Sequence, residues 1–309
     1  MNIKKFALIL LSVTISHILF AEQLRDTFGK NGLVFEPVQI QVQNLKRSYT
    51  FVWISDLHVI ADDISEVAPK SQPGQRRKRD KRFNNIRSGM KPSAVWKKLP
   101  GLLNGFECDA VFFGGDICDV GSIANLTVLK DGFKQLKKPF IYLREDHDMT
   151  PWCLANKDTA EQQRISKEID GHPAVPFIEY DDLIVVGIDN NITNVTAEAL
   201  AELKKHCAKN KPVIVLLHVP INAKDNISLN LLRKEDRRYN HMWRAFMRPD
   251  QNTRDLISLI TDKNSPVKAV FAGHLHFSWD GMLSPGVRQH IFAPAYEGNI
   301  GLITITPSE

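Results

Sequence analysis

The sequence predicts an α/β domain with mixed sheets, and three observations support this. Short apolar runs typical of buried strands alternate with longer segments of helical periodicity. A hairpin is indicated where the runs 177–179 and 183–188 flank Tyr180, Asp181 and Asp182, so some strand pairs are antiparallel. The 309 residues are 43% hydrophobic and 24% charged, which is ordinary for a globular protein with a substantial core.

Apolar runs place the strands along the chain. We expect strands at residues 49–54, 109–114, 139–143, 177–179, 183–188, 212–217, 267–272, 287–293 and 300–306. The run 109–114 ends in Gly114, Gly115 and Asp116, and glycine allows a sharp turn and a close approach by other groups. Residues 22–48 show little pattern and are interpreted as a lead-in segment.

Helical periodicity fills the gaps between several of these strands. We expect helices at residues 93–99, 125–136, 161–169, 196–209 and 253–261. Ser93 is a suitable N-cap for the first helix, and Pro100 followed by Gly101 predicts its end. Thr196 is a suitable N-cap for the helix that follows it.

The N-terminus has the pattern of a secretory signal peptide over residues 1–21. Lys4 and Lys5 precede an almost wholly apolar stretch, and Ala21 precedes the polar Glu22. We therefore expect an exported protein, periplasmic or secreted, with an uncleaved membrane anchor as the alternative. No later apolar run approaches the roughly 20 residues that span a bilayer.

The four cysteines do not have the spacing of a zinc ribbon. They are Cys108, Cys118, Cys153 and Cys207. Four cysteines allow three pairings, and the sequence does not choose among them. Small buried residues with at most one disulfide are the favoured interpretation.

The positive charge of this chain is concentrated in one segment. Residues 70–98 contain eleven Lys and Arg residues and a single acidic residue, Asp80, whereas the net charge of the whole chain is +5. The basic run consists of Arg76, Arg77, Lys78, Arg79, Lys81 and Arg82. It is either a solvated surface or a contact for an anionic polymer or headgroup. Phe83 and Trp96 are the aromatic residues nearby, so base stacking has little support.

Five predicted strands end in carboxylate or imidazole side chains. These residues are Asp56, His58, Asp116, Asp146, His147, His218, His274 and His276. In an extended chain residues i and i+2 point the same way, so Asp56 and His58 are expected to face one region together. Buried charges and imidazoles are costly unless they are paired or bound to metal. The ligand types suit Mn, Fe, Zn, Co or Ni.

The order of these motifs resembles the calcineurin-like metallophosphoesterase superfamily. The motifs are Asp-Leu-His, Gly-Gly-Asp-Ile-Cys-Asp, Glu-Asp-His-Asp, Leu-His-Val-Pro and Gly-His-Leu-His, and they extend over residues 55–276. The resemblance implies a two-sheet sandwich with mixed sheets flanked by helices, and metals at the carboxyl ends of the strands. It also implies a single catalytic domain over residues 22–309, with insertions at about 60–96 and 222–252.

The resemblance implies a role for each motif residue. Asp56, His58 and His276 would hold one metal ion, and Asp146, His218 and His274 a second. Asp116 would bridge the two ions. His147 would be the outer-sphere acid that protonates the leaving oxygen, with Asp148 orienting it. The implied reaction is hydrolysis of a phosphate monoester or diester by in-line attack of a metal-bridging hydroxide.

The chain departs from the family pattern at two places. Glu145 and Asp146 stand where the family has Gly and Asn. A carboxylate in place of a neutral amide predicts tighter metal binding and a more basic nucleophile. Asp119 occupies the place of the metal-binding tyrosine of purple acid phosphatases, which argues against that subfamily.

The sequence gives fewer indications of the substrate contacts than of the metal ligands, and it leaves two alternative functions open. The second insertion interleaves arginines with aromatic residues, so Arg237, His241 and Trp243 are candidate substrate contacts together with Arg144. A helix that packs its aromatic face on the domain would explain the same pattern. One alternative function is a non-catalytic metal-binding or scaffold module on the same fold. The other is a nuclease or nucleotidase that uses the basic 70–98 loop.

Overall fold

A computed structural model describes most of the chain. The described residues are 32–61, 82–84, 87, 89–149, 160, 164, 169, 175–190, 194–222, 229 and 249–308. The predicted signal peptide, Cys153, and most of the helix predicted at 161–169 and of both insertions lie outside them. Among the described helices, none has the length and apolar character that a membrane crossing requires.

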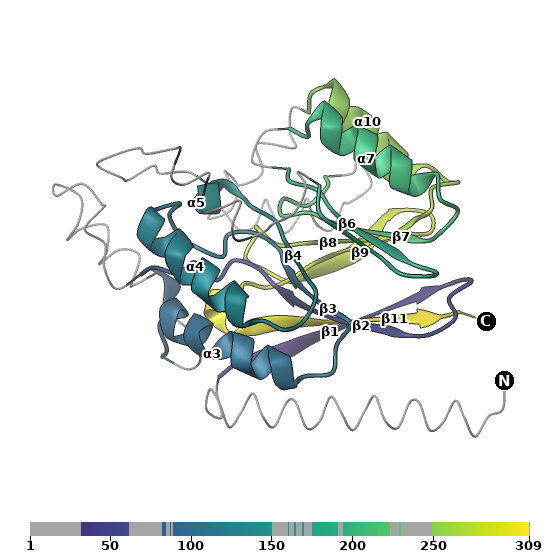
Figure 1. Cartoon of the computed structure of the whole chain (residues 1–309). Helices are drawn as coiled ribbons and strands as arrows, with labels where there is room; N and C mark the ends of the chain where they lie inside the picture. The colour runs from purple at the N-terminus through teal and green to yellow at the C-terminus, as the bar shows by residue number, and fades with distance from the viewer. Residues whose placement is uncertain are drawn as a thin grey trace, which may run out of the picture.

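The first sheet has five strands in the order β1-β11-β2-β3-β4 (Figure 1). In that order they are Val34–Val42, Asn299–Pro307, Tyr49–Ile54, Ala110–Phe113 and Phe140–Tyr142. β2, β3 and β4 are parallel, whereas β11 is antiparallel to β2 and parallel to β1. The carboxyl ends of β2, β3 and β4 therefore meet at one edge of the sheet.

The second sheet has six strands in the order β5-β6-β7-β8-β10-β9. In that order they are Phe177–Glu179, Ile184–Gly187, Val213–Leu216, Val267–Ala272, Val287–Ile291 and Trp279–Ser284. The four central strands are parallel, and β5 and β9 are antiparallel at the two edges. The predicted hairpin at 177–188 and the predicted mixed sheets are thus confirmed.

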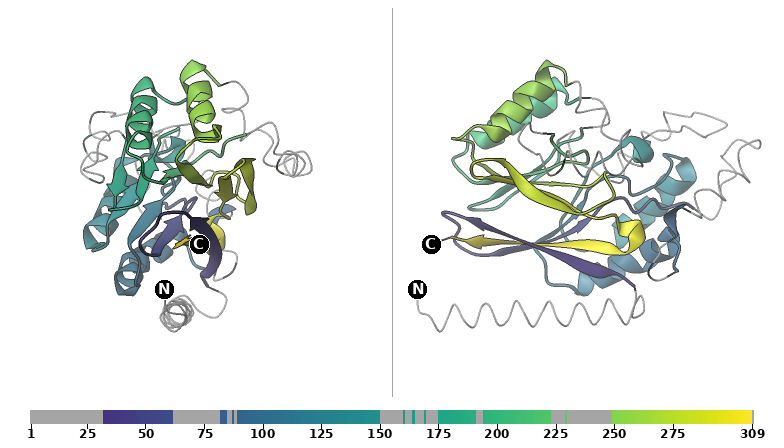
Figure 2. Two further views of the ribbon diagram at one scale, coloured as in Figure 1. Left: turned by 90° about the vertical axis from the view of Figure 1, so that its right-hand side faces the viewer. Right: turned by 180° about the vertical axis from the view of Figure 1, so that it is seen from behind.

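Helices cover the outer faces of the two stacked sheets (Figures 1 and 2). α3 (Pro92–Gly105) and α4 (Ile123–Gln135) lie on the first sheet, and α7 (Ala197–Cys207) and α10 (Gln251–Thr261) lie on the second. A third apolar layer, with Phe51, Phe112 and Phe271, fills the space between the sheets. Short helices α5 (Asp146–Met149) and η1 (Ala295–Glu297) lie in loops. The fold class expected from the family resemblance is therefore confirmed.

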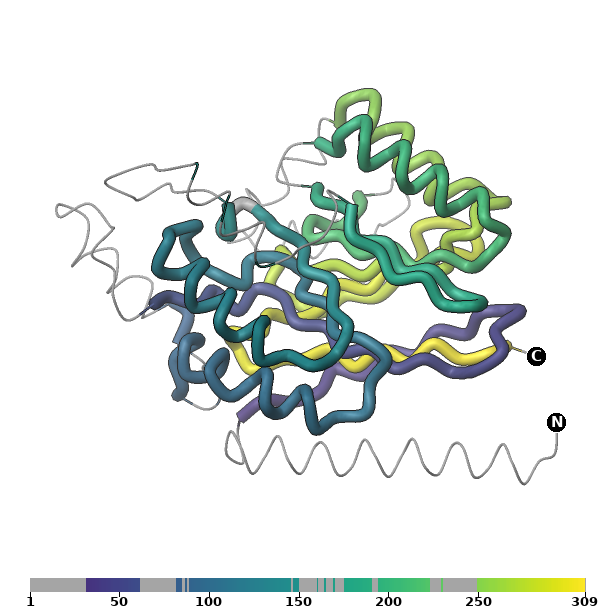
Figure 3. Tube along the Cα trace, in the orientation of Figure 1, coloured from purple at the N-terminus to yellow at the C-terminus, as the bar shows by residue number. Residues whose placement is uncertain are grey.

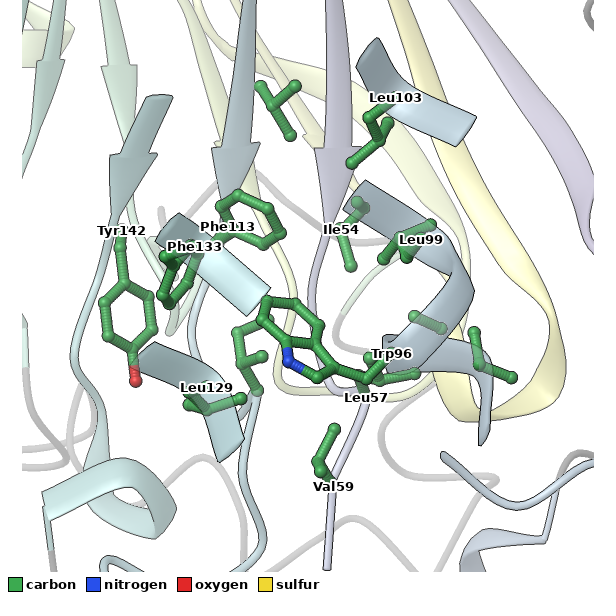
Figure 4. Packing of buried hydrophobic residues seen from close by; sticks show 14 of the residues in the cluster. Ile54, Leu57, Val59, Trp96, Leu99, Leu103, Phe113, Leu129, Phe133 and Tyr142 are labelled. Atoms are coloured by element: carbon green, nitrogen blue, oxygen red, sulfur yellow. The ribbon is translucent and has the colours of Figure 1, made fainter. Parts of the chain in front are cut away.

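Helix α3 is longer than predicted, because packing outweighs the proline signal. The helix runs through Pro100 to Gly105, with Pro92 in its first turn and no side-chain cap from Ser93 or Lys91. A proline inside a helix costs about 3 kcal/mol. Trp96 and Leu99 before the proline and Leu103 after it lie on one buried face (Figure 4), and each buried side chain of this kind stabilises by about 1.5–3 kcal/mol.

Strand β1 was missed in the segment interpreted as a patternless lead-in. Its second half alternates buried Val38, Ile40 and Val42 with exposed Gln39 and Gln41, which is the signal of a half-buried strand. Its first half hides that signal, since it contains a proline and a glutamate. β1 lies at the edge of the sheet beside β11 (Figure 3), where a proline is tolerated.

One partly buried contact between a carboxylate and an imidazole joins the two sheets. Glu36 on β1 lies 2.8 Å from His290 Nε2 on β10 and accepts a hydrogen bond from the backbone N–H of Ala293. On its other side, His290 Nδ1 lies 2.9 Å from the Asp280 carboxylate. Burial alone would raise the pKa of Glu36, but His290 and Ser278 hold it below its ordinary value.

We expect Glu36→Gln to lower the free energy of unfolding by about 1–3 kcal/mol, because it weakens a charge-assisted link between the sheets. Urea denaturation measures this. Gln41→Ala, an exposed position on the same strand, is the matched control and should change stability by less than about 0.5 kcal/mol. Equal effects of the two substitutions would contradict the assigned role of Glu36.

Candidate metal centre

Two adjacent loops bring the first candidate ligands together. The loop after β2 carries Asp56 and His58, and the loop after β3 carries Asp116. The loops are joined by backbone hydrogen bonds from Asp56 N to Gly115 O and from His58 N to Asp116 O, both 3.0 Å long. Because β2 and β3 are parallel neighbours, their carboxyl ends deliver these side chains to one place.

The backbone of these loops is left-handed rather than extended. Asp56, His58, Asp116, His274 and His276 have φ angles of 53°, 52°, 53°, 68° and 57°. The expectation that i and i+2 residues share a face through extended backbone is therefore wrong, although the residue pairs do converge. A left-handed residue other than glycine costs about 1–2 kcal/mol. Buried Leu57 and Leu275, which lie between the members of each pair, help to hold these turns in place.

The two glycines at the end of β3 permit close approach, as predicted. A Cβ atom on Gly114 would lie 2.0 Å from the Trp53 ring. Gly115 has φ +89°, and a Cβ there would lie 2.5 Å from Glu145 Cγ and 2.7 Å from His218 Nδ1. Any larger residue would displace His218.

The first cluster consists of Asp56, His58 and His276, whose potential ligand atoms all lie within 4.8 Å of one another. His276 Nε2 lies 3.2 Å from Asp56 Oδ1 and 3.5 Å from His58 Nε2. All three side chains are buried.

The second cluster consists of Asp116, His218 and His274, again within 4.8 Å. His218 Nε2 lies 3.3 Å from Asp116 Oδ2 and 3.1 Å from His274 Nδ1. Asp116 Oδ2 also lies 3.9 Å from His58 Nε2 in the first cluster. One carboxylate thus stands between the two clusters.

Other predicted site residues are not described at the level of side chains. These are Asp146, whose backbone begins α5 but whose side chain lies outside the described part, and Arg237, His241 and Trp243. The basic residues Arg76, Arg77, Lys78, Arg79 and Lys81 also lie outside it. Arg144 is half-buried after β4, where its guanidinium lies 3.9 Å from Asp189.

The donor set fits metal ions. Two ligand atoms at about 2.1 Å from one tetrahedral ion are about 3.4 Å apart. The nitrogen–nitrogen distances of 3.1 and 3.5 Å in the two clusters agree with this spacing. Among the described residues, Asp116 Oδ1 is buried without a hydrogen-bond partner. A cation would satisfy this oxygen, and a buried carboxylate oxygen left unsatisfied is costly.

The electrostatics keep the carboxylates ionised. Burial would raise the pKa of Asp56, but the hydrogen bond from His276 and the charge of His218 lower it to about 2. The pKa of Asp116 is likewise held well below its ordinary value by His218 and His147, against the effect of burial. Burial lowers the pKa of His58 to about 4, so this imidazole is neutral and able to bind metal at pH 7.

His147 has a different orienting partner from the predicted one. Its Nδ1 lies 2.8 Å from the backbone oxygen of Asp119 and 3.4 Å from the Asp119 carboxylate. Asp148 instead accepts hydrogen bonds from the backbone N–H groups of Cys118 and Glu145. The prediction that Asp148 orients His147 is wrong, because both of its oxygens face the backbone of the neighbouring turns. Asp119, which also lies 3.2 Å from His58 Nδ1, takes this place.

We expect the pKa of the His147 imidazole in the metal-free protein to lie far above that of an ordinary histidine. Burial would lower its pKa, but Asp116 and Asp119 raise it to about 9. Its contribution to stability is therefore fully present below pH 6.5 and is lost as the pH rises through about 9. NMR titration of the ring measures this, and Asp119→Asn should lower the pKa. A midpoint near 6.5 in the unaltered protein would contradict the assignment.

Two buried amides that were not predicted from the sequence hold the loop that carries His218. The Asn190 oxygen accepts from the backbone N–H groups of His218 and Val219, and its Nδ2 donates to Val219 O. Gln289 makes a similar pair of hydrogen bonds with the backbone of Ile221. Asn190 follows β6 in the same way as the candidate ligands follow their strands. A polar residue after an apolar run could therefore have indicated its place near the site.

The aromatic residues of the first insertion are buried. Phe83 stacks on His58, and Trp96 packs against Phe113 and Phe133 in the core (Figure 4). Neither ring is available to stack on a nucleic-acid base, so the weakly supported stacking hypothesis is corrected.

Comparisons with known proteins found a family model and solved structures that are similar to this chain. A family model described as calcineurin-like phosphoesterase matches residues 49–278. No curated protein matches the sequence. A solved dimetal phosphatase from Danio rerio is similar in fold, with 12% identity, a TM-score of 0.38, and 81% of this chain and 88% of that chain covered.

Two further solved structures are similar at the level of fold. Phosphopantetheinyl hydrolase from Mycobacterium tuberculosis has 13% identity and a TM-score of 0.40, with 80% of this chain and 90% of that chain covered. A purple acid phosphatase from yellow lupin, Lupinus luteus, has 13% identity and a TM-score of 0.43, with 84% of this chain but 45% of that chain covered.

Proposed function

Because this chain belongs to the calcineurin-like phosphoesterase family, we propose that it is a dinuclear-metal-dependent phosphoesterase that hydrolyses a phosphate monoester or diester. The single observation that carries this proposal is the position of Asp116. Its carboxylate faces an imidazole of each of two clusters that have the composition of metal sites.

We assign one metal ion to each cluster. Asp56, His58 and His276 would hold one ion, His218 and His274 with Asp146 a second, and Asp116 would contact both. When bound, the two ions would neutralise phosphate charge and supply the nucleophile for hydrolysis. The tighter metal binding expected from Asp146 in place of asparagine remains a prediction.

His147 is proposed to donate a proton to the leaving oxygen. Asp119, which lies outside both proposed ligand sets, is one of the carboxylates that raise the pKa of this imidazole and so favour its protonated form. The contact between Nδ1 and Asp119 directs Nε2 away from that residue. The side chain of His147 is 25% exposed, whereas that of His58 is 1% exposed. This difference supports an approach of substrate from the side of His147 and half-buried His274.

The direct test is an activity assay on protein reconstituted separately with Mn²⁺, Fe²⁺, Zn²⁺, Co²⁺ and Ni²⁺. We expect metal-dependent hydrolysis of p-nitrophenyl phosphate or bis-p-nitrophenyl phosphate, and none after chelation. A protein that binds two ions but hydrolyses neither ester with any metal would contradict the proposal.

Glu145 favours the alternative of a non-catalytic module on the same fold. This residue replaces the glycine of the family motif and is fully buried, and neither of its carboxyl oxygens has a hydrogen-bond partner among the described residues. Burial raises its pKa well above the ordinary value. If Glu145 blocks catalysis, Glu145→Gly should create activity in an inactive parent protein.

We also propose that residues 1–21 direct export to the periplasm or the medium. N-terminal sequencing of the exported protein tests this, and a chain that begins at Glu22 is the expected result. The proposed nuclease or nucleotidase alternative depends on basic residues outside the described part. A substrate panel that includes nucleotides and single-stranded DNA distinguishes it from the small-ester activity.

A further inference from the structure

An aromatic ring from the first insertion lies flat on a ligand of the first cluster. Phe83 and His58 stack with ring centroids 4.0 Å apart and an interplanar angle of 14°. Both side chains are 1% exposed. Phe83 is not part of any motif that supports the family assignment, and it follows directly on the basic run that ends at Arg82.

A second ring completes this contact. Tyr296, on η1, meets Phe83 edge to face with centroids 5.1 Å apart. The Tyr296 hydroxyl lies 3.3 Å from His276 Nδ1. The backbone N–H of Tyr296 donates to Asp56 O, which ties the ring to the loop of the first cluster. Both imidazoles of the first cluster therefore have a packed aromatic neighbour.

The His58 ring is constrained on two sides. Asp119 lies 3.2 Å from its Nδ1 and fixes the direction of the ring, while Phe83 covers one ring face at contact distance. For His58 to leave a bound ion, its ring must rotate, and rotation requires Phe83 to move first. A metal-bound imidazole is also partly cationic, and a cation is attracted to the face of a phenyl ring.

We propose that Phe83 is a positioning residue that holds His58 in its ligating orientation and thereby makes the first metal the slowly exchanging one of the pair. This inference depends on the proposed dinuclear centre. The second site should exchange faster, because its ligand His274 is half-buried whereas His58 and His276 are buried. The first insertion then has a defined task, which is to deliver this ring to the metal centre.

The experiment follows metal release from the full-length protein loaded with Co²⁺, using an excess of a chromogenic chelator. We expect two phases of equal amplitude in the unaltered protein. Phe83→Leu should accelerate the slow phase roughly tenfold and leave the fast phase unchanged. Phe83→Tyr keeps a ring at this position and should retain the slow phase. The visible absorption spectrum of the bound Co²⁺ ion that is released slowly should change in Phe83→Leu but not in Phe83→Tyr.

Phe133→Leu is the matched control. This side chain is also buried, but it packs in the core with Trp96 and Phe113. The control makes the same chemical change and should leave both phases unaltered. If Phe83→Leu does not fold, Phe83→Met is used in its place, since it keeps a long apolar side chain but removes the ring that stacks on His58, and it should also accelerate the slow phase.

Several outcomes would overturn the inference. An unchanged slow phase in Phe83→Leu, equal acceleration by Phe133→Leu, or a single release phase in the unaltered protein would each do so while leaving the proposed function intact. A protein that binds no Co²⁺ would overturn the proposed function together with the inference.

Discussion

Replacing Asp116 with asparagine is expected to lower kcat/KM by a factor of about 10³ or more and to reduce metal retention. Asp116 lies 3.9 Å from His58 and 3.3 Å from His218, so its charge acts on both clusters. Asparagine preserves the shape of the side chain but removes the negative charge that would balance two cations. Because the pKa of Asp116 is held well below its ordinary value, this charge is present throughout the neutral range.

The measurement combines steady-state kinetics with the metal content per chain after gel filtration. Asp182→Asn is the matched control, since Asp182 is a buried carboxylate that accepts from Tyr49 at the other end of the domain. The control should keep its metals and its activity. An Asp116→Asn protein that retains two ions and full activity would show that another group joins the two sites.

Replacing His147 with glutamine is expected to lower kcat by a factor of about 10²–10⁴ while both metals are retained. His147 belongs to neither proposed ligand set, so its loss should remove proton donation alone. The loss should be greater for alkyl phosphates than for p-nitrophenyl phosphate, because a poorer leaving group depends more on protonation. Kinetics on both ester types measure the difference.

Asp119→Asn provides a second test of the same step. Asp119 contacts both His147 and the proposed ligand His58, so the comparison is made on variants that retain both metals. Among these, adding Asp119→Asn to His147→Gln should lower kcat little further than His147→Gln alone. His206→Gln, at a buried histidine on α7, is the matched control and should leave kcat unchanged. Equal losses for alkyl and aryl esters would contradict a role for His147 as the acid.

The chemistry of the site could be predicted from the sequence because its signal is local. Apolar runs that end in Asp56, Asp116 or His218 mark parallel strands whose ends meet, and the structure brings these side chains together. The backbone conformation of the loops that bring these side chains together was not predictable. Left-handed turns at non-glycine residues are disfavoured locally and persist only because tertiary packing holds them.

Other features depended on contacts that no local pattern encodes. Asp148 is next to His147 in the sequence, and Asp119 belongs to a different motif. Only the three-dimensional arrangement decides which of the two carboxylates faces the His147 ring. Pro100 ends a helix by local rules, but buried residues on both sides of it extend α3. Phe83 reaches His58 from a separate part of the chain.

The most direct test of the central claim is a crystal structure of the metal-reconstituted protein with anomalous diffraction recorded at the metal edge. We expect two anomalous peaks, one among Asp56, His58 and His276 and one beside His218 and His274, with Asp116 in contact with both. A single peak, or two peaks that do not share Asp116, would contradict it.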